Sequence, residues 1–495
     1  MIRKYSRFFI IYLLLAALSC RTVENTAGPN DLTTMLREMN AGTAGKALQA
    51  ALMVEAPLSR FHLLSEIAGV LAGMNLTDQA ARVTELAELA MSEVPSESAR
   101  AELLPRLAEG YVRSGRNEKG AALLKEALSV LDGSMAESVQ GNILKQVIAI
   151  GFQGGESTFD LPGEAVQQSL VIQNLEIRLD LLIYAAEQYR NYNIGLFSDT
   201  LIQQAIPAAG SIENLWSRAL GMIRLAVLIA ETGDEDYGRQ MAHRGIRSME
   251  NVTVIVRPEE EARKVVRIAG YLAELGMEDD AVIAAETIEF PRLRAEAYAK
   301  IAEEWNKQDE PIRSEIYLSI AYEIAREIDD PFRKISALAL LGRTAAALSG
   351  SGDILDSVFS LLPELIIAPS DPFEQQRSLF IYIDALIDRG MTDQAMPLIK
   401  DLSSFYDRTR LYLGAAEKLI DLEKFDDAKR TVLTAEQEAN KSEFIQDQLY
   451  ADAAVIMFRL GLSGEAASLL DRIQDPYTLG FAYVQMQKSN PDQIL

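Results

Sequence analysis

The chain has 495 residues, and its 72 acidic residues against 48 lysines and arginines give a formal net charge of −24 at pH 7. Such an acidic surface repels phosphate backbones, which argues against nucleic-acid binding. The single cysteine excludes an internal disulfide and a zinc site built from several thiolates. Because one hydrophobic core stops growing near about 250 to 300 residues, the chain forms either several domains or a repeat array.

The N-terminus has the layout of a secretion signal. Three basic residues lie within residues 1–7, residues 8–18 form an apolar run, and the small residue Ser19 precedes Cys20. The apolar run is shorter than the about 20 residues that span a bilayer as a helix. Cleavage before Cys20 would remove basic residues and no acidic one, so the mature chain is more acidic still.

This arrangement resembles the signal of a bacterial lipoprotein, in which the cysteine becomes the acylated first residue and carries palmitate among its acyl groups. The resemblance implies a signal peptide at residues 1–19, followed by a lipidated Cys20 and a flexible tether over residues 20–30. The match departs from the usual pattern because Ala17 stands where leucine is usual and Leu18 comes one place late. Ordinary signal cleavage, which leaves Cys20 unmodified, is the alternative.

The residue after the cysteine bears on localisation. It is Arg21, not the aspartate that retains lipoproteins at the inner membrane in some bacteria. We therefore expect a lipid-anchored protein of the cell envelope, at the periplasmic face of the outer membrane in preference to the inner membrane. Exposure at the cell surface is the alternative.

Small residues recur at fixed offsets along the rest of the chain. In the clearest copy Ala108 and Tyr111 are followed by Gly115 and Gly120. Two helices approach closely only where both carry small side chains, and the turn between them favours a residue that tolerates positive φ. The offsets recur around eleven anchors, 33 to 43 residues apart: Ala68, Ala108, Ala149, Ala186, Ala226, Ala269, Ala302, Gly342, Ile383, Ala416 and Ala454.

These offsets resemble the tetratricopeptide repeat, although most steps exceed its about 34 residues. The resemblance implies an all-α, right-handed solenoid of about eleven degenerate TPR-like helix pairs over residues 31–495. Helix starts support this phasing, because an aspartate precedes a proline at three predicted first turns. These are Asp330-Pro331, Asp371-Pro372 and Asp475-Pro476.

Four segments interrupt the pattern. Residues 153–163 are rich in glycine and include a proline, which predicts a longer loop and a bend of the superhelix near residues 153–165. Residues 349–353 and 366–372 predict two further breaks. The β-branched run 252–256 predicts a short extended connector and no sheet.

Catalytic chemistry has little support in the sequence. The two histidines, His62 and His243, lie far apart, and stacking of neighbouring repeats does not bring such residues together. Phosphate-binding, dinucleotide-binding, nucleophile-elbow and metalloprotease motifs are absent. We therefore predict no catalytic, cofactor-binding or metal-binding residue and no cofactor. An enzyme with an unfamiliar clustered site is an alternative.

Aromatic and basic side chains are better candidates for a binding role. Trp216 and Trp305 are the only tryptophans, and on a solenoid such residues anchor peptides or apolar ligands. Packing within their own helix pair is the alternative for both. Arginines near the anchors are candidates for gripping carboxylates, with plain surface charge as the alternative: Arg178, Arg224, Arg267 and Arg343.

The leading interpretation is a non-enzymatic envelope lipoprotein that acts as a protein–protein interaction scaffold. Stacked helix pairs create a long groove, and the expected occupant is an envelope protein or peptide. The lipid anchor holds the chain at a membrane and raises its effective concentration near membrane-bound partners. The alternative is a periplasmic receptor that binds a small hydrophobic ligand for a transporter, which would require an enclosed apolar tunnel.

Overall fold

The structure is a computed structural model that describes residues 42–131, 135–249, 258–348, 352–369, 371–442 and 445–489. Within these ranges the regular structure is helical and consists of 24 α-helices and one short 3-10 helix. The predicted signal peptide, Cys20, the tether and the connector 252–256 lie outside the described residues.

The chain divides into two compact units. Unit 1 comprises residues 1–95, 113–115 and 450–495, so it combines both ends of the chain, and unit 2 comprises residues 96–112 and 116–449. Unit 1 holds α3 (Thr43–Ala51), α4 (Pro57–Gly73), α5 (Thr77–Ser92), α24 (Gln446–Arg459) from residue 450 onward, α25 (Ser463–Leu470) and α26 (Pro476–Ser489).

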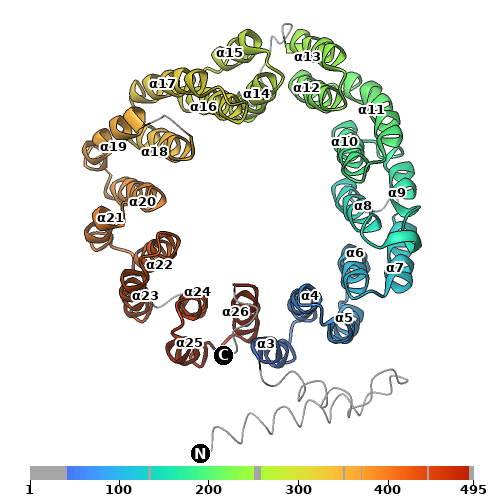
Figure 1. Ribbon diagram of the computed structural model, residues 1–495, viewed down its shortest axis with the longest axis horizontal. Helices are drawn as coiled ribbons and strands as arrows, with labels where there is room; N and C mark the ends of the chain where they lie inside the picture. Colours follow the sequence, from blue (N-terminus) through green and yellow to red (C-terminus); the bar gives the residue numbers. More distant parts are fainter. Residues whose placement is uncertain are drawn as a thin grey trace, which may run out of the picture. The chain divides into compact units, whose positions relative to one another are not determined.

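Unit 2 holds the remaining helices, which follow one another along the chain (Figure 1). They are α6 (Glu97–Arg113, up to residue 112), α7 (Asn117–Ser129), α8 (Glu137–Gly151), η1 (Gly155–Ser157), α9 (Leu161–Ser169), α10 (Leu175–Asn191), α11 (Gly195–Gly210), α12 (Leu215–Glu231), α13 (Glu235–Met249), α14 (Pro258–Glu274), α15 (Glu278–Glu286), α16 (Pro291–Lys307), α17 (Pro311–Arg326), α18 (Pro331–Ala347), α19 (Gly352–Ile366), α20 (Pro372–Asp388), α21 (Thr392–Ile399), α22 (Phe405–Asp421) and α23 (Phe425–Ala439).

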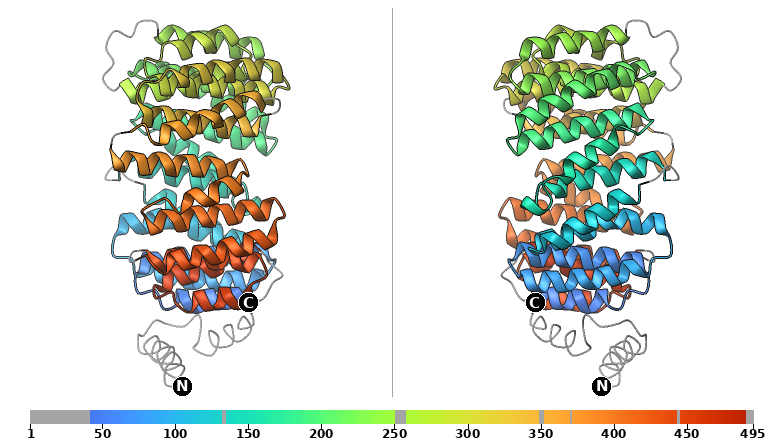
Figure 2. Two further views of the ribbon diagram at one scale, coloured as in Figure 1. Left: turned by 90° about the vertical axis from the view of Figure 1, so that its left-hand side faces the viewer. Right: turned by 90° about the vertical axis from the view of Figure 1, so that its right-hand side faces the viewer.

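The helices are arranged in consecutive pairs, from α4–α5 to α24–α25. Each of the eleven predicted anchors lies on the first helix of a pair, which confirms the predicted phasing and the all-α solenoid. Within unit 2 the first helices, such as α10, α12 and α14, contact one another in sequence order and form one layer, while the second helices form the other. Figure 2 shows successive helices of unit 2 stacked side by side.

The turn inside a pair uses a left-handed residue, as the sequence predicts. Gly115, Gly233 and Gly276 have φ of 78°, 99° and 69°, and Asn75 and Glu423 take the same conformation at 61° and 58°. Glycine adopts this conformation without the steric cost that a Cβ atom brings. In most pairs this residue stands seven places after the anchor and two places beyond the end of the first helix, where the chain reverses.

Close helix crossing explains the small residues of the second helices. A Cβ atom on Gly238 of α13 would lie 2.8 Å from the carbonyl oxygen of Ala226 in α12. A Cβ atom on Gly120 of α7 would likewise lie 3.1 Å from the carbonyl oxygen of the equivalent Ala108 in α6. Backbone therefore meets backbone at these crossings, and a larger side chain cannot fit.

The predicted helix starts are also confirmed. The side chain of Asp330 accepts a hydrogen bond from the backbone N–H of Arg333 at 2.7 Å, and Asp371 accepts one from Phe373 at 3.0 Å. Asp475 does the same for Thr478 at 2.8 Å. Each cap satisfies one of the free N–H groups that begin a helix.

The loop predicted at residues 153–163 is replaced in part by regular structure. Residues 155–157 form η1, and α9 begins at Leu161, so the insertion lies inside the pair α8–α9 and shortens its second helix to nine residues. The bend near residues 153–165 stays a prediction.

The first and last of the described helices form a pair of their own within unit 1. Helix α26 lies beside α3 and α4 (Figure 1). A Cβ atom on Gly480 would lie 3.3 Å from the Cβ of Ala50, and the Nζ of Lys46 lies 5.8 Å above the ring of Tyr483. Lys488 donates to Glu66 at 2.7 Å. The chain thus has a composite pair, α26–α3, made from its two ends.

Candidate partner-binding cleft

The two tryptophans occupy different environments. Trp305 of α16 is only 4% exposed, and the guanidinium of Arg313 in α17 lies 4.6 Å above its ring. Trp305 therefore packs between the two helices of its pair, as the alternative interpretation expects, and offers little surface to a partner. Trp216, at the second position of α12, is half-buried.

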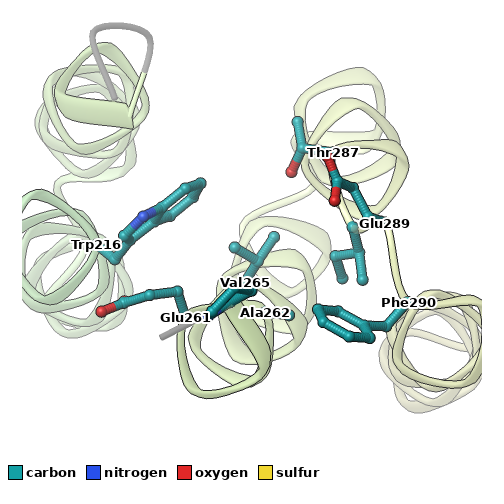
Figure 3. Close-up of a pocket in the computed structure, with 9 residues that line it drawn as sticks. Trp216, Glu261, Ala262, Val265, Thr287, Glu289 and Phe290 are labelled. Atoms are coloured by element: carbon teal, nitrogen blue, oxygen red, sulfur yellow. The ribbon is translucent and has the colours of Figure 1, made fainter. Parts of the chain in front are cut away.

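Trp216 forms one wall of a cleft in unit 2. Figure 3 shows its indole on one side, Phe290 and Glu289 of the α15–α16 connection on the other, and Val265 of α14 between them. The cleft has a volume of about 30 Å³. The full lining is Trp216, Pro258, Glu261, Ala262, Val265, Thr287, Ile288, Glu289 and Phe290.

Glu261 is the buried acidic group of this cleft. It is 8% exposed, and its Oε1 accepts a hydrogen bond at 3.0 Å from the amide of Asn214 that precedes α12. Lys264 lies 3.2 Å from its Oε2 and also donates to Ser217 at 2.9 Å. The hydrogen bonds of Glu261 with Asn214 and of Lys264 with Ser217 join α14 to the start of α12. The ion pair between Glu261 and Lys264 lies within α14 and holds both side chains in place.

Two polar atoms at the cleft remain without a hydrogen bond among the described residues. They are the buried Nε1 of Trp216, which is a donor, and the Oε2 of Glu261, which is an acceptor. A buried polar group that lacks a hydrogen bond costs about 1–3 kcal/mol, so such groups call for an explanation. A ligand that satisfies them gains this energy.

Glu261 is the fourth residue of α14, and the other first helices carry a different residue at their fourth position. The fourth residue of a first helix is often an arginine that donates to a carbonyl oxygen six residues earlier, a contact termed here the arginine clasp. Arg178 donates to Ile172 at 2.8 Å and Arg218 to Ile212 at 2.7 Å, and Arg60 and Arg408 make the same kind of contact. The clasp ties each first helix to the preceding connection.

The arginine clasp is absent at the cleft, as it also is in α8, α18, α20 and α24, whose fourth residue is not arginine. Helix α14 carries Glu261 at the fourth position. Helix α16 carries Arg294 there, but its buried Nε finds no hydrogen-bond partner among the described residues, although Ile288 lies six residues earlier and lines the cleft. Among the described first helices, α14 alone carries an acidic residue at this position, and natural chains often depart from their own local rules at functional sites. The sequence analysis missed this signal, which an alignment of the first helices with one another would have shown.

The other candidate arginines serve mainly to join first helices. Arg224 of α12 and Lys145 of α8 both donate to Asp180 of α10, the former at 2.9 Å. Burial raises the pKa of Asp180, but the hydrogen bonds from Lys145 and Arg224 outweigh burial and hold the pKa below its ordinary value. Arg343 lies 3.8 Å from Asp384 of the next first helix. These arginines thus grip carboxylates of their own chain, whereas Arg267 is exposed.

A second cavity, of about 180 Å³, lies among α21, α22 and α23. Thr392 lines it with a buried hydroxyl that has no hydrogen-bond partner among the described residues. Its rim is polar, with Asp393, Asp427 and Arg430. Neither of these two cavities approaches the about 300–1,000 Å³ of a pocket for a small organic ligand.

Neither histidine lines either of these two cavities. The ring of His62 packs edge-on against Phe61 at 5.6 Å, and the Nδ1 of His243 lies 3.9 Å from Asp280. In the described part of the chain, no group of three or more histidine, cysteine and acidic residues is placed to hold a metal ion. The described ranges also contain no helix that is long and apolar enough to cross a membrane.

Comparison with known proteins gives structural likeness only. No family model and no curated protein matches the sequence. Ton1535 from Thermococcus onnurineus NA1 shares 13% identity over 69% of this chain and 96% of its own, with a TM-score of 0.28. Aspartyl phosphate phosphatase F from Bacillus subtilis shares 14% identity over 71% and 96%, with a TM-score of 0.25.

A third structure, a Rap protein complexed with competence and sporulation factor, shares 13% identity over 78% of this chain and 98% of its own, with a TM-score of 0.23. At these identities and TM-scores the comparisons carry no argument about function. The assignment as an all-α solenoid rests on the chain's own helix pairs.

Proposed function

We propose that the chain is a non-enzymatic lipoprotein of the cell envelope that holds a partner protein through its helix-pair array. The observation that carries the proposal is the cleft at Trp216, where a large aromatic ring remains half-buried beside polar atoms that lack hydrogen bonds. Aromatic side chains at partly desolvated clefts are typical anchors of protein interfaces.

The anchor and the localisation rest on the sequence. Lipidation of Cys20 would tether the array to a membrane, with the periplasmic face of the outer membrane as the expected site. Tethering would raise the effective concentration of the array near other envelope proteins. A Cys20→Ser variant should appear in the soluble fraction of the cells, whereas the unaltered chain should remain with the membranes.

The alternative, a receptor for a small hydrophobic ligand, receives no support from the two cavities. The cleft at Trp216 is too small for such a ligand, and the larger cavity has a polar rim. The alternative therefore stays a prediction of the sequence alone. Recovery of a lipid or another small hydrophobic molecule with the purified protein would revive it.

A photo-reactive residue in place of Trp216 tests the scaffold proposal in intact cells. We expect crosslinking to capture one recurrent envelope protein, identified by mass spectrometry. The matched control carries the same photo-reactive residue at Leu196, which is apolar and 80% exposed on α11, away from the cleft. Capture of the same proteins from both positions, or of none from Trp216, would contradict the proposal.

A further inference from the structure

We propose that the cleft at Trp216 takes a peptide segment of the partner in which an apolar side chain stands next to a lysine or arginine. The inference rests on the proposed scaffold function and names the kind of segment that the scaffold would hold. Three features of the cleft support it: an apolar slot, a free hydrogen-bond donor in its wall, and a free carboxylate at its rim.

The slot is apolar on opposite sides. The indole of Trp216 faces Phe290 across Val265, and Ala262 and Ile288 complete the surface (Figure 3). Its volume of about 30 Å³ is close to that of one water molecule, so only part of a side chain, such as the branched end of a leucine, can enter without movement of the walls. Entry of this group would remove apolar area on both partners from water.

The wall of the slot offers hydrogen bonds that suit a peptide backbone. The Nε1 of Trp216 is buried and donates to no described residue, whereas the Oε2 of Glu261 lacks a hydrogen bond among these residues but is ion-paired with Lys264 at 3.2 Å. Glu261 is more than nine-tenths buried and is held in place by Asn214. A peptide backbone offers C=O acceptors, one of which would complement the Nε1 donor of Trp216.

The negative charge at the rim of the cleft favours a basic residue next to the apolar side chain of the bound peptide. Glu289 is exposed and forms no ion pair among the described residues. By contrast, Glu261 has Lys264 at 3.2 Å, and Glu259 has Arg263 at 2.9 Å. A lysine or arginine beside the apolar anchor would pair with Glu289, and the acidic net charge of the chain would assist its approach.

Tryptophan fluorescence gives a direct test because the chain has only two tryptophans. In a Trp305→Phe variant, Trp216 is the sole emitter. The probes are three capped pentapeptides, Ala-Lys-Leu-Lys-Ala and its relatives with serine in place of leucine or with glutamate in place of both lysines. We expect a saturable blue shift with the lysine–leucine probe at up to about 5 mM, and about tenfold weaker binding for each of the other two.

Two variants assign the effect to the cleft. Glu289→Gln, at an exposed position, should reduce the preference for lysine over glutamate about threefold or more without change in the fold. Phe290→Ala should weaken binding of the leucine probe about tenfold, whereas Phe373→Ala, which removes a phenylalanine that is 67% exposed on α20, should leave it unchanged.

The outcomes separate this inference from the scaffold function. No saturable response, or equal binding of the three probes, would overturn the inference. If crosslinking at Trp216 still captured an envelope protein, the scaffold function would stand and only the proposed segment chemistry would fall. If neither experiment gave a signal, both would fall.

Discussion

Unit 1 and unit 2 are built from the same kind of helix pair but are held together by contacts of very different range. In unit 2, bonds between neighbouring pairs join residues such as Lys264 and Ser217, 47 positions apart. In unit 1, Lys488 and Glu66 are 422 positions apart. Unit 2 therefore follows the nearest-neighbour logic of a solenoid, whereas unit 1 forms only when both ends of the chain meet.

This difference has a consequence for the ends of the array. Terminal repeats of a solenoid expose a face that a neighbour would otherwise cover, and many repeat proteins cover it with a special polar helix. Here α26 covers α3 and α4 with buried apolar side chains that include Tyr483, Val484 and Met486. Each end of the chain thus serves as the neighbour of the other.

Removal of α26 should have the largest effect. Deletion of residues 476–495 uncovers α3 and α4, and the loss of several buried side chains, each contributing about 1.5–3 kcal/mol, should open unit 1. Hydrogen exchange followed by mass spectrometry should show at least hundredfold faster exchange in α3 and α4 but unchanged exchange in α12 and α16. Retained protection in α3 and α4 would contradict the role assigned to α26.

A matched pair of core truncations should sharpen the comparison. Leu63 of α4 and Leu225 of α12 are 1% and 0% exposed, so replacing either with alanine should cost about 2–5 kcal/mol. A Cβ atom on Gly480 would lie 2.4 Å from Leu63, so Leu63→Ala should accelerate exchange in the distant α26. Leu225→Ala should accelerate hydrogen exchange only in α12 and in the helices next to it in the sequence. Identical local patterns for both variants would remove the distinction between the units.

The arginine clasp of Arg408 in unit 2 should contribute more to the free energy of unfolding than that of Arg60 in unit 1. Arg408 donates to Leu402 and, at 2.8 Å, to Glu438, and both charged side chains are 14% exposed. Arg408→Ala should therefore cost about 2–3 kcal/mol in unfolding free energy. Arg60 of unit 1 reaches Val54 only at 3.4 Å and pairs with Glu93, which is 44% exposed.

Arg60→Ala should accordingly cost less than about 1 kcal/mol. Urea unfolding of both variants checks the difference, with tryptophan fluorescence for unit 2 and exchange of α4 for unit 1. A larger loss for Arg60→Ala would show that the geometry of the clasp does not set its contribution.

The smallest effect should come from carboxylates of unit 2. Partial desolvation of the carboxyl group raises the pKa of Glu274 although the residue as a whole is exposed, and Glu304 and Glu231 raise it further, so the folded state disfavours its charged form. Glu274→Gln should stabilise unit 2 at pH 7 by under about 0.5 kcal/mol, because the side chain is exposed. The gain should shrink as the pH falls through the raised pKa and vanish below the ordinary value of 4.5, where Glu274 is protonated in both states.

Glu438 should show the opposite pH dependence. Burial raises its pKa, but hydrogen bonds from Lys441 and Arg408 outweigh burial and lower it overall. Its contribution to stability is therefore present above the ordinary value of 4.5 and lost as the pH falls through the lowered pKa. Urea unfolding midpoints between pH 3 and pH 7, measured for Glu274→Gln and Glu438→Gln, check the direction of the pH dependence of stability at each residue.

Much of the fold could be predicted from the sequence because its rules are local. The anchors, the left-handed turn residues such as Gly233 and the aspartate caps such as Asp330 each act within one pair. The composite pair α26–α3 could not be predicted in this way. Ala50 and Gly480 come into contact only when the whole chain folds, and no local sequence pattern predicts a contact between residues so far apart in the chain.

The candidate site was predicted only in part. Both tryptophans were singled out by type, but the sequence alone does not tell a ring that packs within its pair, as Trp305 does, from one that lines a cleft, as Trp216 does. The signal that distinguishes them is the acid at Glu261, where six of the ten other described first helices carry arginine and none carries an acid. Its meaning depends on the arginine clasp, which only the structure shows.

A disulfide test addresses the composite pair most directly. Replacing Ala50 and Gly480 with cysteine in a Cys20→Ser background places two Cβ atoms about 3.3 Å apart, near the about 3.5–4.5 Å of disulfides, once the Leu63 methyl group moves aside. The account predicts that mild oxidation links α26 to α3 in the folded protein, as peptide mass spectrometry would show. Ala50→Cys with Gly464→Cys, in α25, is the control and should stay unlinked. Failure of the first pair to link in a folded protein would contradict the account.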